Sequence, residues 1–362
     1  ADSSPARSSF TPLAKIETML DALVASEGEP DLVQISGGEP TLHPDFFAIL
    51  DAVRARPIRH VMINTNGLRI AREPDFVAKL AANKRGLEVY LQFDSLKREA
   101  LVNLRGADLR KIRQQALENL ERYGVSTTLV ATIKRGVNDA EIGDIIRHAL
   151  TWKCVRGVTL QPVQDAGRNE AFNKDTDRIM LSEIRQRVIE TGVFGDKDMI
   201  PLPCNPESVS IGYGLRSGDK VLPLTSLIPQ EQLVAVMPNT ISPEKYPVLR
   251  EKFVDLFSLS SGPLNTSERV CELLCCLPSF EVPEGLTYEN VFRVTIVQFL
   301  DRFNFCVGNV KRSCIHFVTE SGAIIPFDTY NLFYRDGKID GIRASLAGQT
   351  YREARQGEEV PR

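Results

Sequence analysis

Two glycines and a glutamate follow a short apolar run near the beginning of the chain. The run 31–36 (DLVQIS) leads into Ser36-Gly37-Gly38-Glu39-Pro40. Because glycine has no Cβ, the backbone amides and carbonyls of such a turn can approach a ligand closely. Glu39 adds a charge, and Pro40 stiffens the exit from the turn. The pattern predicts a site for a polar ligand, and the other interpretation is a tight turn that needs glycine for its geometry alone.

Cysteine is the second residue type that could carry chemistry. The chain has seven cysteines, and five of them lie in the last hundred residues. They are Cys154, Cys204, Cys271, Cys275, Cys276, Cys306 and Cys314. An odd number without a secretory context indicates thiols, core packing or metal binding rather than a disulfide framework. Cys271 and Cys306 fit core packing, and Cys154 fits an inert position.

Several familiar kinds of catalytic site have no support in the sequence. The four histidines (His43, His60, His148 and His316) lack the i, i+4 spacing of a zinc helix. We find no GxSxG elbow, no P-loop and no dinucleotide fingerprint. A lyase or aldolase would need a lysine at a strand end, and Lys134 only comes close to one.

The elements that must position these residues follow a regular rhythm. Five apolar, β-branched runs begin at residues 31, 60, 87, 126 and 155, and amphipathic segments separate them. This is the period of strand-plus-helix units whose parallel strands are buried on both faces. We predict an α/β fold, a partial (β/α) TIM-type barrel that lacks its first strand, with a doubly wound sheet as the alternative.

The alternation of apolar runs and amphipathic segments stops near Gly167, and the remaining chain has a mixture of predicted helices and strands. We predict helices over 181–191, 268–277 and 291–303, and a β-hairpin over 314–330 with its turn at Glu320-Ser321-Gly322. The domain boundary is placed at 195, with the barrel in 1–195 and a smaller mixed α+β region in 196–362. Asn138 to Glu141 has the pattern of a capping box.

Composition narrows the functional class. Lys+Arg total 44 and Asp+Glu total 47, for a net charge of -3, so a basic nucleic-acid module is excluded. No apolar stretch approaches eighteen residues and no signal peptide is visible, so we expect a cytoplasmic protein without a transmembrane segment.

The strings SGGEPTLHPDF and INTNGLRIA resemble the radical S-adenosylmethionine (radical SAM) superfamily, in its branch of molybdenum-cofactor A and peptide-maturase enzymes. The resemblance implies that the loop Gly37, Gly38, Glu39 and Pro40 holds the methionine moiety of S-adenosylmethionine. It further implies contacts to the cofactor from Asn64, Asn66, Gln92, Asp94 and Gln161, at the ends of later strands. For Asn66 and Asp94, turn chemistry or a helix cap is an equal alternative.

Enzymes of this superfamily hold a radical-generating [4Fe–4S] cluster on the motif CxxxCxxC, and this sequence contains no such motif. The opening string ADSSPARSSFTPLAKI resembles the sequence that follows the last of these cysteines. We therefore expect a chain truncated just past the motif and inactive alone. A natural protein without the cluster is the other explanation.

The strings PLPCNPESV, LLCCLPSF and KRSCIHFVTESGAIIPFDTYNLFYRD resemble a group that includes tetraether lipid synthases and pterin-methylating radical enzymes. The resemblance implies an auxiliary iron–sulfur site on Cys204, Cys275, Cys276 and Cys314. It also implies a small-molecule or lipid substrate and an electron donor such as flavodoxin or ferredoxin. The function predicted is an oxidoreductase or transferase that forms C–C bonds or transfers methyl groups, and the alternative is a non-catalytic binding or assembly partner.

Overall fold

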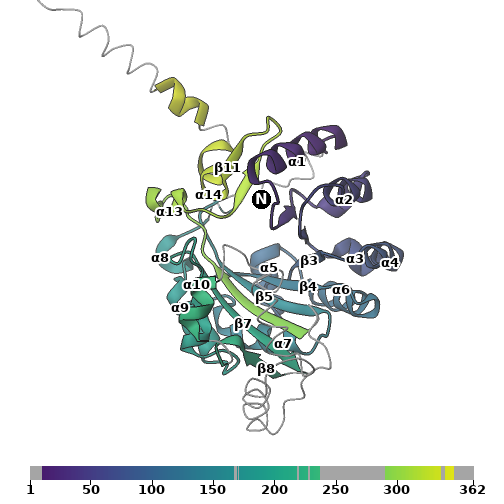
Figure 1. Cartoon of the computed structure of the whole chain (residues 1–362). Helices are drawn as coiled ribbons and strands as arrows, with labels where there is room; N and C mark the ends of the chain where they lie inside the picture. The colour runs from purple at the N-terminus through teal and green to yellow at the C-terminus, as the bar shows by residue number, and fades with distance from the viewer. Residues whose placement is uncertain are drawn as a thin grey trace, which may run out of the picture.

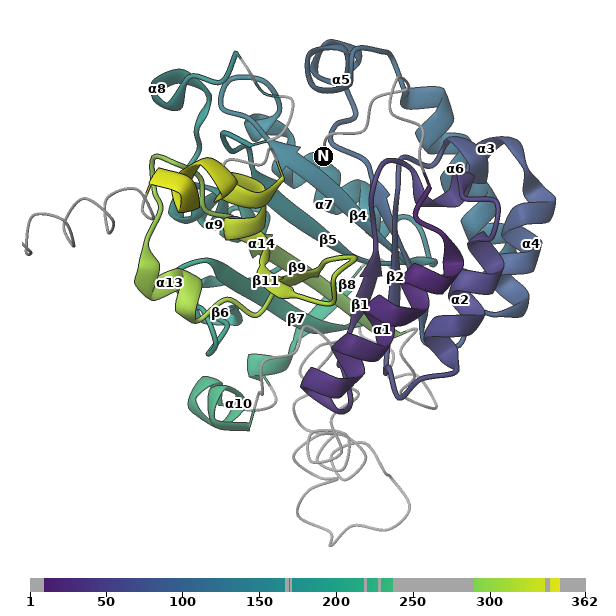
Figure 2. The same cartoon turned by 90° about the horizontal axis from the view of Figure 1, so that it is seen from above.

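The computed structural model describes residues 10–166, 169, 171–217, 220–226, 229–236, 290–335 and 339–345. A single nine-stranded sheet forms the centre of this part of the chain (Figures 1 and 2). No helix among these residues is long and apolar enough to cross a membrane.

Six neighbouring strands of this sheet run parallel to one another. They are β1 (Val33–Ile35), β2 (Val61–Thr65), β3 (Leu87–Gln92), β4 (Thr127–Ile133), β5 (Val155–Pro162) and β9 (Val291–Val297). The first five lie side by side in sequence order. A doubly wound sheet would reverse its order part-way, so this succession confirms the predicted partial barrel and excludes the alternative.

The C-terminal half continues the same sheet in the opposite direction. Strand β7 (Val209–Ser217) pairs antiparallel with β9, and β6 (Met199–Pro201) and β8 (Lys220–Pro223) both pair antiparallel with β7. These strands belong to the same sheet as the barrel strands. The domain boundary placed at 195 stays a prediction.

Helices cover the outer face of the sheet. Helices α1 (Leu13–Glu27), α2 (Phe46–Arg54), α3 (Leu68–Arg72), α4 (Pro74–Ala82), α6 (Arg110–Tyr123), α7 (Ile142–Leu150) and α9 (Leu181–Ile189) contribute to one hydrophobic cluster with the strands. The other elements are α5 (Arg98–Arg105), α8 (Lys174–Asp177), α10 (Gln230–Val236), α13 (Val307–Lys311), α14 (Phe327–Thr329), the 3-10 turns η1 (Pro40–Leu42), η2 (Asp139–Glu141), η3 (Asp196–Asp198) and η4 (Leu224–Ser226), and a π-helical turn, η7 (Tyr330–Tyr334). The helix predicted over 181–191 is confirmed by α9.

The helix predicted over 291–303 is wrong, because residues 291–297 form β9. All seven residues of this strand are buried, and yet the sequence alternates, with Arg293 and Thr295 between the apolar residues. The core-facing residues Phe292, Val294 and Ile296 belong to the same hydrophobic cluster as β5. Such alternation is typical of a strand, so the sequence itself contained a signal against a helix. The helix predicted over 268–277 lies outside the described residues.

A second, two-stranded sheet follows β9. Strands β10 (His316–Val318) and β11 (Ile324–Pro326) are antiparallel, which confirms the predicted hairpin, and Gly322 has a φ of 80° in its turn. The hairpin lies beside α1 in both views (Figures 1 and 2), where Lys15 Nζ is 2.6 Å from a Glu320 carboxylate oxygen. Helix α14, which follows the hairpin, is held to the loop after β9, because the Leu300 amide donates to Asp328 Oδ1 at 2.8 Å.

Candidate functional site

The loop Ser36-Gly37-Gly38 lies exposed at the carboxyl end of β1. Gly37 has a φ of 147°, which L residues rarely adopt, and a Cβ added there would meet no protein atom within 4 Å. The carboxyl edge of a parallel barrel is where ligands bind. The loop therefore offers an open stretch of backbone that a polar ligand can approach.

Glu39 uses its carboxylate within the protein. Oε1 accepts hydrogen bonds from the Thr41 amide at 3.2 Å, the Thr41 hydroxyl at 2.6 Å and the Thr65 hydroxyl at 2.8 Å. Oε2 accepts from the Asn66 amide at 2.7 Å. These bonds join η1, which begins at Pro40, to the end of β2. The geometry favours a role for the Glu39 side chain in shaping the loop, beside the backbone of Gly37 and Gly38.

Three amide side chains line the inner face of the barrel near the same edge. Gln92 Nε2 donates to Asn64 Oδ1 at 3.2 Å, and Asn64 Nδ2 reaches Ser36 Oγ at 3.4 Å. These side chains point away from the helices, because their strand neighbours Ile63 and Leu91 belong to the cluster on the outer face.

Gln161 continues this row on β5. Its Nε2 donates to the Tyr90 hydroxyl at 3.2 Å. Burial raises the pKa of Tyr90 to about 12, so the phenol is neutral at pH 7. The structure thus brings the predicted residues of three strands to one neutral, hydrogen-bonding surface.

Asn66 and Asp94 are engaged in the turns that follow their strands. Asn66 Oδ1 accepts from the Leu68 amide at 2.9 Å where α3 begins. Asp94 has a φ of 65° and is fully buried. Its carboxylate accepts from Arg105 Nε at 2.6 Å, Arg105 Nη2 at 2.8 Å and the Thr132 amide at 3.1 Å. The contacts of these two side chains favour turn chemistry over direct contact with a cofactor.

The capping box predicted at Asn138 is absent. The Asn138 side chain donates to the carbonyls of Asp94 and Thr132, both at 2.8 Å, and so ties the end of β3 to the end of β4. Glu141 instead accepts from the Ser95 hydroxyl at 2.9 Å. Asn138 lies four residues and Glu141 one residue before α7 begins at Ile142, but contacts with distant residues occupy both side chains.

Two arginines near the site were missed by sequence reasoning. Arg105 pairs with Asp94, and Arg113 on α6 donates from Nη1 to the Asn66 carbonyl. A sequence signal existed for Arg113, because it shares a helical face with the buried residues Ala116, Leu117 and Leu120. A charged residue on a buried stripe needs a tertiary partner.

The described cysteines have varied surroundings. Cys204 and Cys314 form a disulfide bond, with an Sγ–Sγ distance of 2.21 Å and a Cα–Cα distance of 6.6 Å. Cys271, Cys275 and Cys276 lie outside the described residues. Cys154 is buried, and burial raises the pKa of its thiol above its ordinary value, in line with an inert position. The interpretation of Cys306 as a core residue is wrong, because its side chain is exposed before α13.

The residues present fit S-adenosylmethionine better than they fit the radical cluster. Gly37 and Gly38 expose backbone at the barrel edge, where an amino acid moiety could bind. The sequence has no CxxxCxxC motif, and among the described residues no three His, Cys, Asp or Glu side chains gather as metal ligands.

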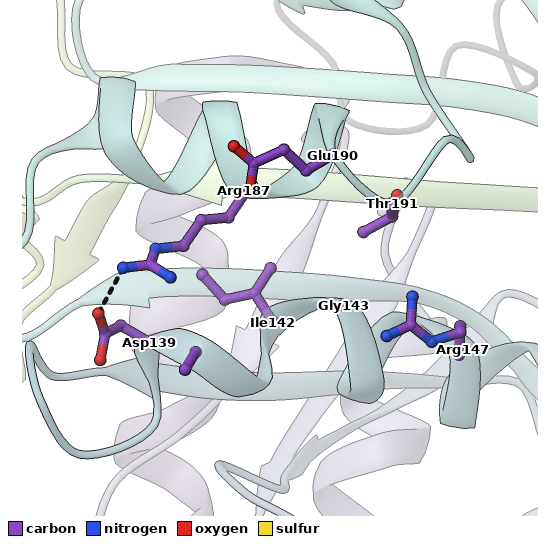
Figure 3. Close-up of a pocket in the computed structure, with 8 residues that line it drawn as sticks. Asp139, Ile142, Gly143, Arg147, Arg187, Glu190 and Thr191 are labelled. Atoms are coloured by element: carbon purple, nitrogen blue, oxygen red, sulfur yellow. Dashed lines mark hydrogen bonds and ion pairs between the residues drawn. The ribbon is translucent and has the colours of Figure 1, made fainter.

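A hollow of about 180 Å³ lies elsewhere, between the 3-10 turn η2, α7 and α9 on the outer face (Figure 3). Asp139, Arg147, Arg187 and Glu190 line it. Arg187 is paired with Asp139 at 2.7 Å, and Arg147 with Asp144 at 2.8 Å. Both arginines are thus paired. Because α7 and α9 cover the outer face of the sheet, this hollow is separate from the row of amide side chains on the inner face.

Comparison with known proteins finds a family match over the N-terminal part of the chain. The model of the radical SAM superfamily matches residues 3–149, which include the glycine loop and β1 to β4. This part of the chain is thus similar to the radical SAM superfamily. The matched radical SAM region stops before β5, so Gln161 and the C-terminal cysteines lie outside it.

Relatives of known function extend the similarity. The chain is 28% identical over 358 residues to 7,8-dihydro-6-hydroxymethylpterin dimethyltransferase of Methanocaldococcus jannaschii, covering 88% of this chain and 70% of that protein. It is 24% identical over 156 residues to GTP 3′,8-cyclase of Synechocystis, covering 43% and 46%. It is 34% identical over 127 residues to mycofactocin maturase MftC of Mycolicibacterium smegmatis, covering 35% and 31%. The chain thus spans less than half the length of the latter two relatives.

Among solved structures, a domain of pyruvate-formate lyase-activating enzyme from Bacteroides vulgatus matches 44% of this chain and 91% of that one, with 19% identity and a TM-score of 0.33.

Proposed function

We propose that this chain is the cofactor- and substrate-binding barrel of a radical SAM enzyme. In this proposal the intact enzyme generates a 5′-deoxyadenosyl radical from S-adenosylmethionine. It uses the radical for C–C bond formation or methyl transfer on a lipid- or pterin-like substrate. The three cysteines of the radical cluster must then be supplied by residues that this sequence does not contain, and the electron by a donor such as flavodoxin or ferredoxin.

The observation that carries the proposal is the open glycine loop at the carboxyl end of β1, with a row of amide side chains beside it. Gly37 and Gly38 would hold the amino acid moiety of S-adenosylmethionine through their backbone groups. Asn64, Gln92 and Gln161 would hydrogen-bond polar groups of the cofactor or substrate. Similarity to the pterin dimethyltransferase over 88% of the chain supports methyl transfer to a pterin-like substrate.

An auxiliary iron–sulfur site belongs to the same proposal. Cys204 and Cys314 are 110 residues apart in the sequence, but their sulfur atoms are bonded in the structure. In reduced protein they would present two thiolates, which are the ligands that iron–sulfur clusters require. Cys275 and Cys276 are proposed as the further ligands.

The second candidate function is a non-catalytic barrel that binds a partner or ligand. In that function the barrel would act without the CxxxCxxC motif, which this sequence does not contain. The two functions differ in whether the loop after β1 retains affinity for S-adenosylmethionine.

Titration of the protein with S-adenosylmethionine in anaerobic buffer, followed by calorimetry, tests the proposal. In Gly37→Val the new side chain enters the open space of the loop, and we expect affinity to fall at least tenfold. Gly28→Val is the matched control, because Gly28 also has a positive φ, of 69°, and open space around it, but it follows α1 and precedes β1, whereas the loop lies at the carboxyl end of β1. Equal affinity in the wild type and Gly37→Val would refute the assignment of the loop, and no binding by the wild type would support the non-catalytic function.

A further inference from the structure

Arg113 is a buried arginine with an unusual set of partners. Its side chain is 2% exposed, and Nη1 donates to the carbonyl of Asn66. Nη2 is 4.0 Å from Asp94 Oδ2, too far for a hydrogen bond. Within the part of the chain that the structure describes, Nε and Nη2 have no hydrogen-bond partner. A buried guanidinium that leaves donors unused carries a cost in free energy.

Its place on the helix adds to that cost. Arg113 lies in the first turn of α6, which contains no acidic residue. The positive end of the helix dipole disfavours a cation there. Burial lowers the pKa of Arg113 to about 10, with Arg105 acting in the same direction and Asp94 and Glu39 in the opposite one. The side chain is therefore charged at pH 7 and faces two carboxylates.

These two carboxylates differ in how they are neutralised. Asp94 has a bidentate pair with Arg105. Glu39 forms no ion pair within 4.0 Å among the described residues, and its hydrogen bonds come from Thr41, Thr65 and Asn66, which are neutral donors. The positive charge of Arg113 attracts the Glu39 carboxylate. Arg113 also donates to the carbonyl of Asn66, the residue whose amide donates to Glu39.

We propose that Arg113 is a positioning residue for the cofactor loops. Its hydrogen bond to the Asn66 carbonyl fixes the turn after β2, and its positive charge attracts the Glu39 carboxylate that the Asn66 amide binds, so that the loops after β1 and β2 keep their shape. The inference rests on the proposed function only in naming S-adenosylmethionine as the molecule that these loops hold.

Hydrogen–deuterium exchange on the full chain without cofactor gives a test that is independent of cofactor binding. The amides of Thr41 and Asn66 donate to Glu39, so their exchange reports on the loops directly. In Arg113→Met we expect both amides to exchange at least tenfold faster, with less than a twofold change in β4 and β5. Arg110→Met is the matched control, since Arg110 is an exposed arginine of the same helix that pairs with Asp108. Unchanged exchange at Thr41 and Asn66 overturns the proposal.

A double-mutant cycle separates positioning from simple packing. In a Glu39→Gln background the carboxylate is gone, so Arg113→Met should change amide exchange and S-adenosylmethionine affinity less than threefold, against at least tenfold in the wild-type background. Arg113→Lys keeps the charge and should recover part of the loss. Equal effects in both backgrounds, or a uniform loss of protection across the sheet in both Arg113→Met and Arg113→Lys, would show a packing role and overturn the proposal. Failure of the wild type to bind S-adenosylmethionine would refute the proposed function, while the exchange data would still decide the role of Arg113.

Discussion

The buried ion pair between Arg293 and Glu88 offers the most direct test of how the two halves of the chain are joined. Arg293 lies on β9 and Glu88 on β3, and Arg293 Nη2 donates to the two carboxylate oxygens at 2.7 and 2.6 Å. The side chains are 2% and 0% exposed. His60 Nε2, at 3.1 Å, and the Thr128 hydroxyl also contact the carboxylate. The pair therefore crosses the inside of the barrel at the amino ends of the strands.

Removing one member should cost far more than removing both. In Arg293→Met the Glu88 carboxylate stays buried without its cation, for which we expect a loss of about 3–5 kcal/mol in the free energy of unfolding. In the Glu88→Met, Arg293→Met double variant no buried charge is left, so the loss should be at least ~2 kcal/mol smaller than in Arg293→Met alone. Arg135→Met breaks an exposed pair with Glu183 and should cost no more than about 1 kcal/mol.

The dependence on pH gives a second signature. Burial raises the pKa of Glu88, but Arg293, with His60 and Thr128, overcomes this and holds the pKa well below its usual range. In the wild type the carboxylate thus stabilises the fold above its unfolded pKa, and this contribution is lost as the pH falls toward the folded pKa. Without Arg293, burial dominates and the pKa rises, so the variant loses stability as the pH increases. The difference between wild type and Arg293→Met should therefore be larger at pH 8 than at pH 5.

Urea unfolding followed by circular dichroism at both pH values measures these differences. A loss below ~1 kcal/mol in Arg293→Met, or a double variant as unstable as the sum of the two single variants, would refute the reasoning that the charges are coupled across the barrel.

Three further predictions follow from individual contacts. In Gly157→Ala the new Cβ would lie 2.4 Å from the Arg293 carbonyl oxygen, so β5 and β9 must separate. Thermal unfolding should show that the variant loses about 1–3 kcal/mol in the free energy of unfolding. An unchanged midpoint would contradict this close approach. Burial raises the pKa of Asp328 to about 6, so ionisation of this carboxyl destabilises the fold as the pH rises from 3.8 to 6. The free energy of unfolding of Asp328→Asn should therefore exceed that of the wild type by about 2 kcal/mol at pH 8 and equal it at pH 4. A difference between the two proteins that stays constant with pH would rule this out. After anaerobic reconstitution of reduced protein with iron and sulfide, Cys204→Ala and Cys314→Ala should hold less iron than Cys306→Ala; equal iron in all three would exclude the auxiliary site.

Local patterns in the sequence determined the barrel and the place of its site. Each of the runs that begin at 31, 60, 87, 126 and 155 forms a strand, because β-branched segments buried on both faces and separated by amphipathic segments fit parallel strands. The turn Ser36-Gly37-Gly38 lies at the carboxyl edge for the same reason, since it directly follows the first of these strands. The hairpin at 316–326 could also be predicted from the sequence, because the turn Glu320-Ser321-Gly322 lies between two short apolar runs.

The tertiary structure alone decided which side chains meet. Arg293 reaches Glu88 across 205 residues of sequence, and Cys204 meets Cys314 across 110, because strand order and register bring them together. The same order places β9 beside β5, so that Arg293 and Thr295, the polar residues that alternate with the apolar ones of β9, are buried rather than exposed. Glu39 was visible as a charge near a loop, but that Asn66 and Arg113 would complete its surroundings depended on the packing of α6 against the end of β2. Periodicity and turn chemistry are local properties of a chain, whereas the partners of a buried charge depend on contacts between distant segments.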